Sequence, residues 1–153
     1  MKTLEHRIPP PLVLMVVGAL MWITARYTPH VDLDGAARQV GTLGFGAVGA
    51  IFLLGGFLAF RRARTTIDPV NLDAASTVVT TGIFRFSRNP MYVGFATLLV
   101  AWSIHLAAPW TLLGPLAFVI YIQRFQILPE ERVMQAKFGA PYEAYRARVR
   151  RWL

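Results

Sequence analysis

The chain has 153 residues, 55% of them hydrophobic, a formal net charge of +8 and no cysteine. Its uncharged runs are longer than a soluble domain of this size needs to bury, which favours one membrane-embedded domain. Without cysteine there is no disulfide framework, thiolate chemistry or cysteine-based metal site. The basic residues flank the apolar runs, so we attribute the positive charge to membrane topology and anionic headgroups rather than to nucleic acid.

Three charge-free runs predict four membrane-spanning helices. They contain eighteen, twenty-two and thirty-five residues, at 8–25, 39–60 and 89–123. A spanning helix needs about 20 apolar residues, with a lower limit of about 17, so the third run predicts two short spans joined by a turn at "HLAAPW". The predicted fold is therefore an all-α membrane protein, with cytoplasmic loop and C-terminal helices forming a pocket, and with spans at roughly 9–25, 40–60, 90–106 and 110–127.

The first run resembles a secretory signal peptide in outline, because Lys2 and Arg7 precede an apolar stretch. It has no small-x-small cleavage site, which signal peptides require. We therefore expect an uncleaved first span.

The second run contains "GFGAVG" at 44–49, which matches the glycine pattern of dinucleotide-binding sites. That pattern binds phosphate only between a strand and the N-terminus of a helix, whereas these glycines lie inside a membrane span. We interpret them as packing residues, because small residues four apart, such as Gly46 and Ala50, let two membrane helices approach closely. On this basis we expect the second span to be the tightly packed centre of the bundle.

Basic residues predict the orientation, because cytoplasmic flanks of membrane spans retain lysine and arginine. The segment 61–88 has five arginines and the tail from residue 124 has seven basic residues, whereas the turn at 105–110 has none. The loop 26–39 has two arginines opposed by two aspartates. We predict a multi-pass protein of a bacterial inner membrane, with both termini and the segment 61–88 in the cytoplasm.

The cytoplasmic segment before the third span ends in "STVVTTGIFRFSRNP". Its β-branched residues predict an extended, strand-like piece, followed by a turn at Gly82. Asn89 suits the N-cap of the third span, and Pro90 its first helical position. Two interpretations stay open: a topology marker, or a seat for a ligand carboxylate made by Arg88 and the unpaired amides of the helix start.

The tail predicts two further helices. Pro129 is expected to interrupt the fourth span, and Glu130 and Glu131 to open a short helix that ends at Gly139. Pro141 then starts a final basic helix. Acidic residues in a first helical turn are favoured by the helix dipole, which is sufficient to explain the glutamate pair.

A polar strip offers another explanation for the glutamates. Gln123, Gln126 and Glu130 are spaced three and four residues apart and so share one face of the fourth span. Polar residues on one face of a short span line a cavity more often than they meet lipid. We therefore expect this face to line a cavity.

Two sequence blocks, "TVVTTGIFRFSRNPMYVG" and "EERVMQAKFGAPYEAYRARVRRWL", resemble the integral-membrane methyltransferases of the isoprenylcysteine carboxyl methyltransferase type and the related phospholipid methyltransferases. The resemblance runs from Thr77 to the end of the chain. It implies S-adenosylmethionine as cofactor and a fold other than the soluble Rossmann type. Residues before the first block match only as hydrophobic spans.

The resemblance also implies residue roles. The carboxylate of the cofactor would meet the start of the third span, its ammonium the glutamate pair, and its adenine or sulfonium the aromatic side chains, Phe86 included. Two residues depart from the family pattern, since Asn89 replaces a histidine and Phe84 a tyrosine. The implied cofactor-binding residues are Thr77, Val78, Val79, Gly82, Phe84, Arg88, Asn89, Pro90, Met91, Tyr92, Glu130 and Glu131.

The expected acceptor is lipophilic, because the site lies at the inner ends of two spans. A carboxylate acceptor is favoured, because it is already ionised at pH 7 and needs no base, and no histidine maps near the site. The three histidines are His6, His30 and His105. Candidate catalytic residues are Tyr92, Arg124 and Glu131, candidate substrate-binding residues are Arg124 and Gln126, and no metal is expected.

Two other functions stay open. The membrane steroid reductases have a similar C-terminal region, which allows an NADPH-dependent membrane reductase. A non-catalytic membrane protein whose basic tail binds anionic lipid or a partner is the other alternative.

Overall fold

The computed structural model of the chain describes residues 8–63 and 78–153, and every regular element in these ranges is helical. This confirms the all-α fold class. The elements, in chain order, are α1 Pro10–Tyr27, α2 Gly35–Ala63, the short helix η3 Gly82–Arg85, α3 Pro90–Leu106, η4 Pro109–Leu112, α4 Leu113–Ile122, η5 Gln123–Ile127, α5 Leu128–Phe138 and α6 Ala140–Arg148.

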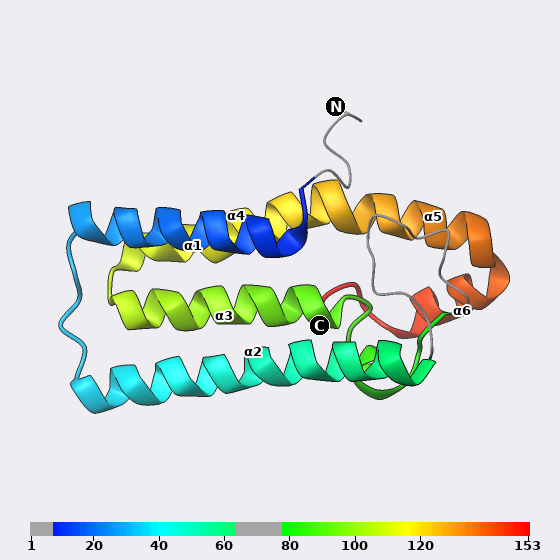
Figure 1. Cartoon of the computed structure of the whole chain (residues 1–153), viewed down its shortest axis with the longest axis horizontal. Helices are drawn as coiled ribbons and strands as arrows, with labels where there is room; N and C mark the ends of the chain where they lie inside the picture. Colours follow the sequence, from blue (N-terminus) through cyan, green and yellow to red (C-terminus); the bar gives the residue numbers. More distant parts are fainter. Residues whose placement is uncertain (1–7, 64–77) are drawn as a thin grey trace.

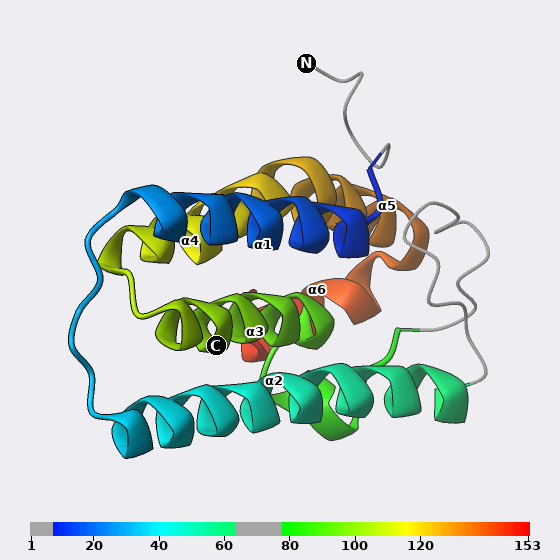
Figure 2. The same ribbon diagram turned by 60° about the vertical axis from the view of Figure 1, so that its left-hand side comes forward.

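The long helices run side by side, with α3 between α2 on one side and α1 and α4 on the other (Figures 1 and 2). Three helical segments are long and apolar enough to cross a membrane, namely Pro10–Tyr27, Gly35–Ala63 and Pro109–Phe138, and α3 is a shorter apolar helix. Each predicted span lies on one of these segments. The protein is therefore an integral membrane protein with three to four helices that suit a bilayer.

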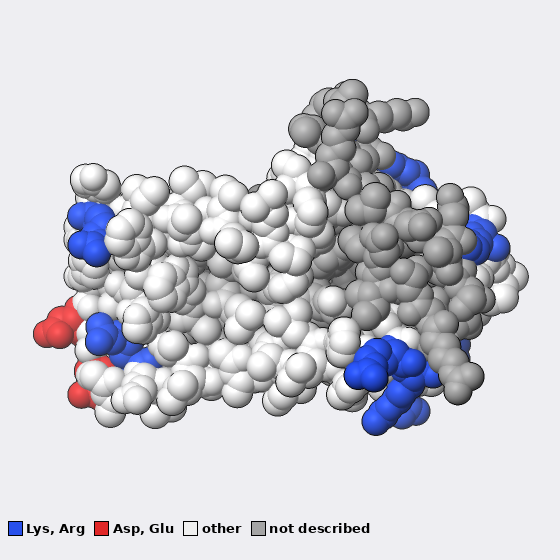
Figure 3. Space-filling view, in the orientation of Figure 1, with Lys and Arg blue, Asp and Glu red and all other residues white. Residues whose placement is uncertain are grey.

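Charged side chains gather at the two ends of the long axis, and the middle of the face shown in Figure 3 carries none. Such a band is what a hydrocarbon layer requires, since charge is costly inside it. The end near the α1–α2 loop carries the acidic groups visible on this face, whereas basic groups are visible at both ends.

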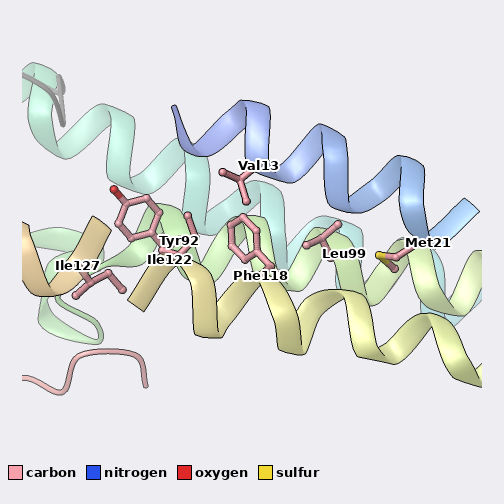
Figure 4. Packing of buried hydrophobic residues seen from close by; sticks show 7 residues of the cluster. All are labelled: Val13, Met21, Tyr92, Leu99, Phe118, Ile122 and Ile127. Atoms are coloured by element: carbon pink, nitrogen blue, oxygen red, sulfur yellow. The ribbon is translucent and has the colours of Figure 1, made fainter. Parts of the chain in front are cut away.

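The main core lies where α1, α3 and α4 meet (Figure 4). Phe118, Ile122 and Ile127 are fully buried there. Lipid is as apolar as these side chains, so van der Waals packing, rather than removal from water, holds the helices together. The remaining buried members of this cluster are Val13, Met21, Tyr92 and Leu99.

The most extensive helix contact joins α2 to α3, and Gly49 of the predicted packing stretch takes part in it, whereas the pair Gly46 and Ala50 does not. A Cβ atom built on Gly94 would lie 2.7 Å from Cγ of Leu53 and 2.9 Å from the carbonyl oxygen of Gly49. At Gly46 a Cβ would meet nothing within 4 Å, and Ala50 is exposed. The prediction for Gly46 and Ala50 was therefore wrong.

The central helix is also α3 rather than α2 (Figure 1). Only 17% of the apolar window of α2 is buried, because this helix packs mainly against α3 and η3. Lipid-facing and protein-facing sides of a span are equally apolar, so glycine content alone did not reveal which side is packed.

The fourth span continues through Pro129 into α5, which corrects the expected interruption. The segment Gln123–Ile127 is π-helical, and the amide of Leu128 donates to the carbonyl of Gln123. Proline lacks an amide hydrogen and its ring clashes with the carbonyl four residues earlier. The wider π turn accommodates the proline without ending the helix.

The segment before α3 turns at Gly82, whose φ of +62° favours glycine. Val78–Thr80 forms no strand, and the first two residues of the expected strand-like piece, Ser76 and Thr77, lie outside the described residues. Phe84 is buried edge-on against Phe60, with ring centroids 5.2 Å apart. Burial raises the pKa of Tyr145, so its hydroxyl stays protonated and donates to the carbonyl of Phe84 at 2.8 Å.

Candidate functional site

Two neighbouring carboxylates at the start of α5 have separate partners. The hydroxyl of Tyr92 on α3 donates to Oε1 of Glu130 at 2.5 Å. Tyr92 is buried in the core and Glu130 is partly buried. This bond connects the first turn of α3 to the first turn of α5. It joins two predicted site residues that are 38 positions apart in the sequence.

Glu131 forms ion pairs with two arginines. Its Oε1 lies 3.1 Å from Nη2 of Arg88, and each of these side chains is only 9% exposed. Arg151, near the C-terminus, donates from Nε to Oε1 at 3.0 Å and from Nη2 to Oε2 at 2.8 Å. Arg88 and Glu131, expected at opposite ends of one ligand, thus contact each other.

Asn89 is the N-cap of α3 by position, and Pro90 is in the first turn, as predicted. The side chain of Asn89, however, makes no capping hydrogen bond. Instead, Nδ2 of Asn89 donates to the carbonyl oxygen of Arg151 at 2.9 Å. The expectation that this side chain caps the helix was wrong, because the tail provides a long-range acceptor for it.

The guanidinium of Arg88 is only partly used by the protein. Its Nη2 atom pairs with Glu131, whereas Nε and Nη1 are buried and have no hydrogen-bond partner. Tyr142 lies beside this pair: burial and the negative charge of Glu131 raise the pKa of its hydroxyl, and the charge of Arg88 and a side-chain hydrogen bond with Arg88 oppose the rise. Buried guanidinium donors without partners are costly in a folded protein, which marks Arg88 as a candidate anion-binding residue.

The polar strip on the fourth span was expected to line a cavity, and its side chains bond protein groups. Gln126 is 1% exposed and its Nε2 donates to the carbonyl of Ile8 at 2.8 Å. Gln123 accepts a hydrogen bond at 2.9 Å from the indole of Trp152. Together with Glu130, these residues connect the fourth span to the start of α1, to the tail and to α3.

Other predicted site residues lie elsewhere. Val79 and Phe84 pack with Ala59 of α2 in a separate apolar cluster. Phe86 is 67% exposed, and the guanidinium of Arg124 lies 5.8 Å from the centroid of the Phe125 ring. Val78 and Met91 are half-buried and Pro90 is buried, whereas Thr77 lies outside the described residues.

No histidine in the described part of the chain is near these carboxylates. His105 stacks on Trp102 near the far end of α3, and His30 lies in the α1–α2 loop at that same end. His6 lies outside the described residues. The groups near Glu130 and Glu131 that can donate or accept protons are tyrosines, arginines and amides.

Sequence reasoning missed four residues of this region. Arg151, Trp152, Tyr142 and Ser87 each contact or hold a predicted residue, and Ser87 accepts a hydrogen bond from the amide of Asn89 at 3.0 Å. We interpreted the tail as a basic helix at the membrane surface. The one available signal was the pair Arg151 and Trp152. A tryptophan next to an arginine is a weak indication that the tail packs on the protein instead of lying in solvent.

A family model described as phospholipid methyltransferase matches residues 37–141. The match covers α2, α3, α4 and α5 and includes Arg88, Tyr92 and both glutamates. This chain belongs to the phospholipid methyltransferase family. The match confirms the resemblance that the two sequence blocks indicated.

Relatives support the assignment to the phospholipid methyltransferase family. An uncharacterized protein of Haemophilus influenzae is 40% identical over 63 residues, which are 41% of this chain and 100% of that protein. Protein-S-isoprenylcysteine O-methyltransferase A of Arabidopsis thaliana is 30% identical over 101 residues, 64% of this chain and 50% of that protein. A probable enzyme of the same name from Oryza sativa subsp. indica is 30% identical over 91 residues, 58% of this chain and 46% of that protein.

The chain therefore spans about half the length of these plant relatives. No solved structure matches it. The part matched by the phospholipid methyltransferase model ends at residue 141, so Arg151 and Trp152 lie beyond it.

Proposed function

We propose that this protein is an S-adenosylmethionine-dependent methyltransferase that acts on a lipophilic acceptor at the cytoplasmic face of the membrane. Membership of the phospholipid methyltransferase family and similarity to plant protein-S-isoprenylcysteine O-methyltransferases support methyl transfer. The position of the candidate site supports a lipophilic acceptor, because Tyr92 lies in the first turn of the apolar helix α3 and Glu130 lies within the apolar segment Pro109–Phe138. The basic residues at this end of the chain support the cytoplasmic orientation.

The observation that carries the proposal is the pair of unpartnered donors on Arg88. An arginine binds a carboxylate best with two parallel N–H groups. The adjacent start of α3 has no side-chain cap, so its first amides add a partial positive charge. These residues fit the carboxylate of S-adenosylmethionine.

The same cofactor carries an ammonium and a sulfonium, which need negative or aromatic surroundings. Glu131 already accepts from two arginines, so we assign the ammonium to Glu130 and give Glu131 the role of orienting Arg88. Tyr92 would hold Glu130 in place through its hydroxyl and offer its ring to a cation. Glu130→Ala should accordingly weaken cofactor binding.

When bound, S-adenosylmethionine supplies a methyl group that its sulfonium has already activated. The residues of the protein then have to bind, orient and exclude water. A carboxylate acceptor needs no base, and Arg124 and Gln126 are the candidates to hold it. An amine acceptor would have to lose a proton, for which the Tyr92–Glu130 pair is the nearest acceptor.

Calorimetry with detergent-purified protein and S-adenosylhomocysteine tests the proposal. We expect measurable binding that falls roughly tenfold or more in Arg88→Ala, because a charge-assisted hydrogen bond is lost. Arg85→Ala is the matched control, since Arg85 is exposed and three residues away. Equal affinities for the wild type and Arg88→Ala would overturn the site.

A thermal-shift panel separates the competing functions. Stabilisation by NADPH but not by S-adenosylmethionine would select the membrane reductase. Lack of stabilisation by either ligand would favour the non-catalytic lipid-binding or partner-binding alternative. Incubation with methyl-labelled cofactor and native membrane lipid extract would then identify the acceptor class by the label it carries.

A further inference from the structure

Three charged side chains form a continuous row that we call the arginine–glutamate–arginine row: Arg88, Glu131 and Arg151. Arg151 approaches both carboxylate oxygens of Glu131, from Nε at 3.0 Å and from Nη2 at 2.8 Å. Arg88 reaches one of these oxygens, Oε1, through Nη2 at 3.1 Å. Arg151 in the tail thus binds Glu131 through two hydrogen bonds, whereas Arg88 binds it through a single contact.

This division of contacts decides how many donors Arg88 retains. A carboxylate beside a single arginine pairs with it through two parallel bonds. With Arg151 holding both oxygens, Glu131 leaves Nε and Nη1 of Arg88 buried and without a partner. Without Arg151, Glu131 would be free to turn and take up a second donor of Arg88.

We propose that Arg151 is a positioning residue that keeps Arg88 available for the carboxylate of S-adenosylmethionine by limiting Glu131 to a single contact with it. The inference rests on the proposed function and deepens it. It assigns the C-terminal segment 149–153 to the cofactor site as one of its walls. Arg151 acts through Glu131 and Arg88 and need not touch the cofactor.

The tail is anchored in a way that can hold Arg151 in place. The amide of Arg88 donates to the carbonyl of Arg150 at 3.0 Å, and Nδ2 of Asn89 donates to that of Arg151 at 2.9 Å. On the other side, the indole of Trp152 bonds Gln123 of the fourth span. Figure 1 shows this segment returning from α6 towards the start of α3.

The tail thus bridges the two elements that carry the predicted cofactor residues, α3 and the fourth span. Trp152 also packs against the main core cluster. Anchors on both sides of Arg151 fix its backbone, so the side chain loses little further freedom when it pairs with Glu131. This explains why Asn89 gives up the helix cap, since its amide holds the tail instead.

Calorimetric titration of S-adenosylhomocysteine into purified Arg151→Ala tests the inference. We expect the Kd to rise roughly tenfold, as it does when a charge-assisted hydrogen bond is lost. Arg150→Ala is the matched control, because Arg150 is exposed and contributes only its backbone carbonyl. An unchanged Kd in Arg151→Ala would overturn the inference.

A second ligand distinguishes positioning from a general loss of structure. Methylthioadenosine has the adenosine and thioether of the cofactor but lacks its amino-acid part and therefore its carboxylate. The Kd of methylthioadenosine should be the same in wild type and Arg151→Ala. An equal rise for both ligands would mean that the tail merely supports the fold, which would overturn the inference.

A double-mutant cycle tests the route of action. If Arg151 acts through Glu131, then Arg151→Ala should have almost no further effect on the Kd in a Glu131→Gln background. Additive effects would contradict that route. Failure of the wild type to bind S-adenosylhomocysteine would instead refute the proposed function itself, so the two failures are distinguishable.

Discussion

At the scale of single residues, the two adjacent glutamates of α5 have divergent roles. Glu130 accepts from the hydroxyl of a buried tyrosine, and Glu131 is neutralised by two arginines. Neighbours on a helix point about a quarter turn apart, so one turn of α5 serves two different environments. A buried carboxylate is tolerated only when it is paired or bonded, and each glutamate satisfies this by a different partner.

Replacement of Tyr92 by phenylalanine tests the first of these environments. Tyr92→Phe keeps the ring in the core but removes the donor to Glu130, so a partly buried acceptor loses its partner. We expect a loss of about 1–3 kcal/mol of stability and a lower midpoint of thermal unfolding in detergent. Tyr27→Phe, at a residue that is 86% exposed, is the control. A Tyr92→Phe midpoint equal to that of the wild type would contradict a structural role for the bond.

At the scale of elements, α3 is the helix around which the others are arranged. It contacts α2 through glycines, the tail through the residues just before its first turn, and α5 through Tyr92. The π-helical segment lies immediately before the glutamates. Because such a segment adds one residue to the helix without ending it, the glutamates are rotated about the helix axis relative to a regular α-helix.

The α2–α3 contact leaves no room for a methyl group on α3. In Gly94→Ala the new Cβ would lie within 3 Å of the carbonyl oxygen of Gly49, a backbone atom that cannot move by a rotamer change. We expect the two helices to separate and the free energy of unfolding to fall by about 1–3 kcal/mol. Denaturation in mixed micelles measures this loss. Gly44→Ala is the control, because a Cβ at that position meets nothing within 4 Å. Its free energy of unfolding should equal that of the wild type or slightly exceed it. An equal loss of unfolding free energy in Gly94→Ala and Gly44→Ala would argue against the contact.

At the scale of the whole molecule, apolar surface and charge divide along the long axis. The middle of the visible face is uncharged, and the candidate site lies at the end where α3 begins (Figures 1 and 3). A cofactor that is zwitterionic and dissolved in water would reach this end from the cytoplasm, whereas a lipophilic acceptor would come from the bilayer. The proposed orientation is therefore essential to the proposed function.

The absence of cysteine from the chain makes this orientation simple to measure. Single substitutions Val31→Cys, in the α1–α2 loop, and Leu153→Cys, at the C-terminus, introduce one thiol each at positions that are 45% and 63% exposed. We expect a membrane-impermeant maleimide to label Val31→Cys in intact spheroplasts and Leu153→Cys only after permeabilisation. The reverse pattern would place the candidate site outside the cytoplasm and contradict the proposal.

Features that depend on local chemistry could be predicted from the sequence. Uncharged runs predict spans because the bilayer excludes charge over a known length. Gly82, Gly139 and Pro90 lie at the turn, helix end and helix start expected of them, because these residue types restrict the backbone wherever they occur. The segment before α3 and the C-terminal tail, which hold the two family motifs, were located for the same reason.

Only the tertiary structure decided which partners meet. Arg151 reaches Glu131 across 20 positions and its carbonyl reaches Asn89 across 62. The helix contact is made by Gly49 and Gly94 rather than by Gly46 and Ala50. Such contacts depend on how each helix is rotated about its axis. Hydropathy cannot reveal that rotation in a membrane span, because lipid and protein core are equally apolar.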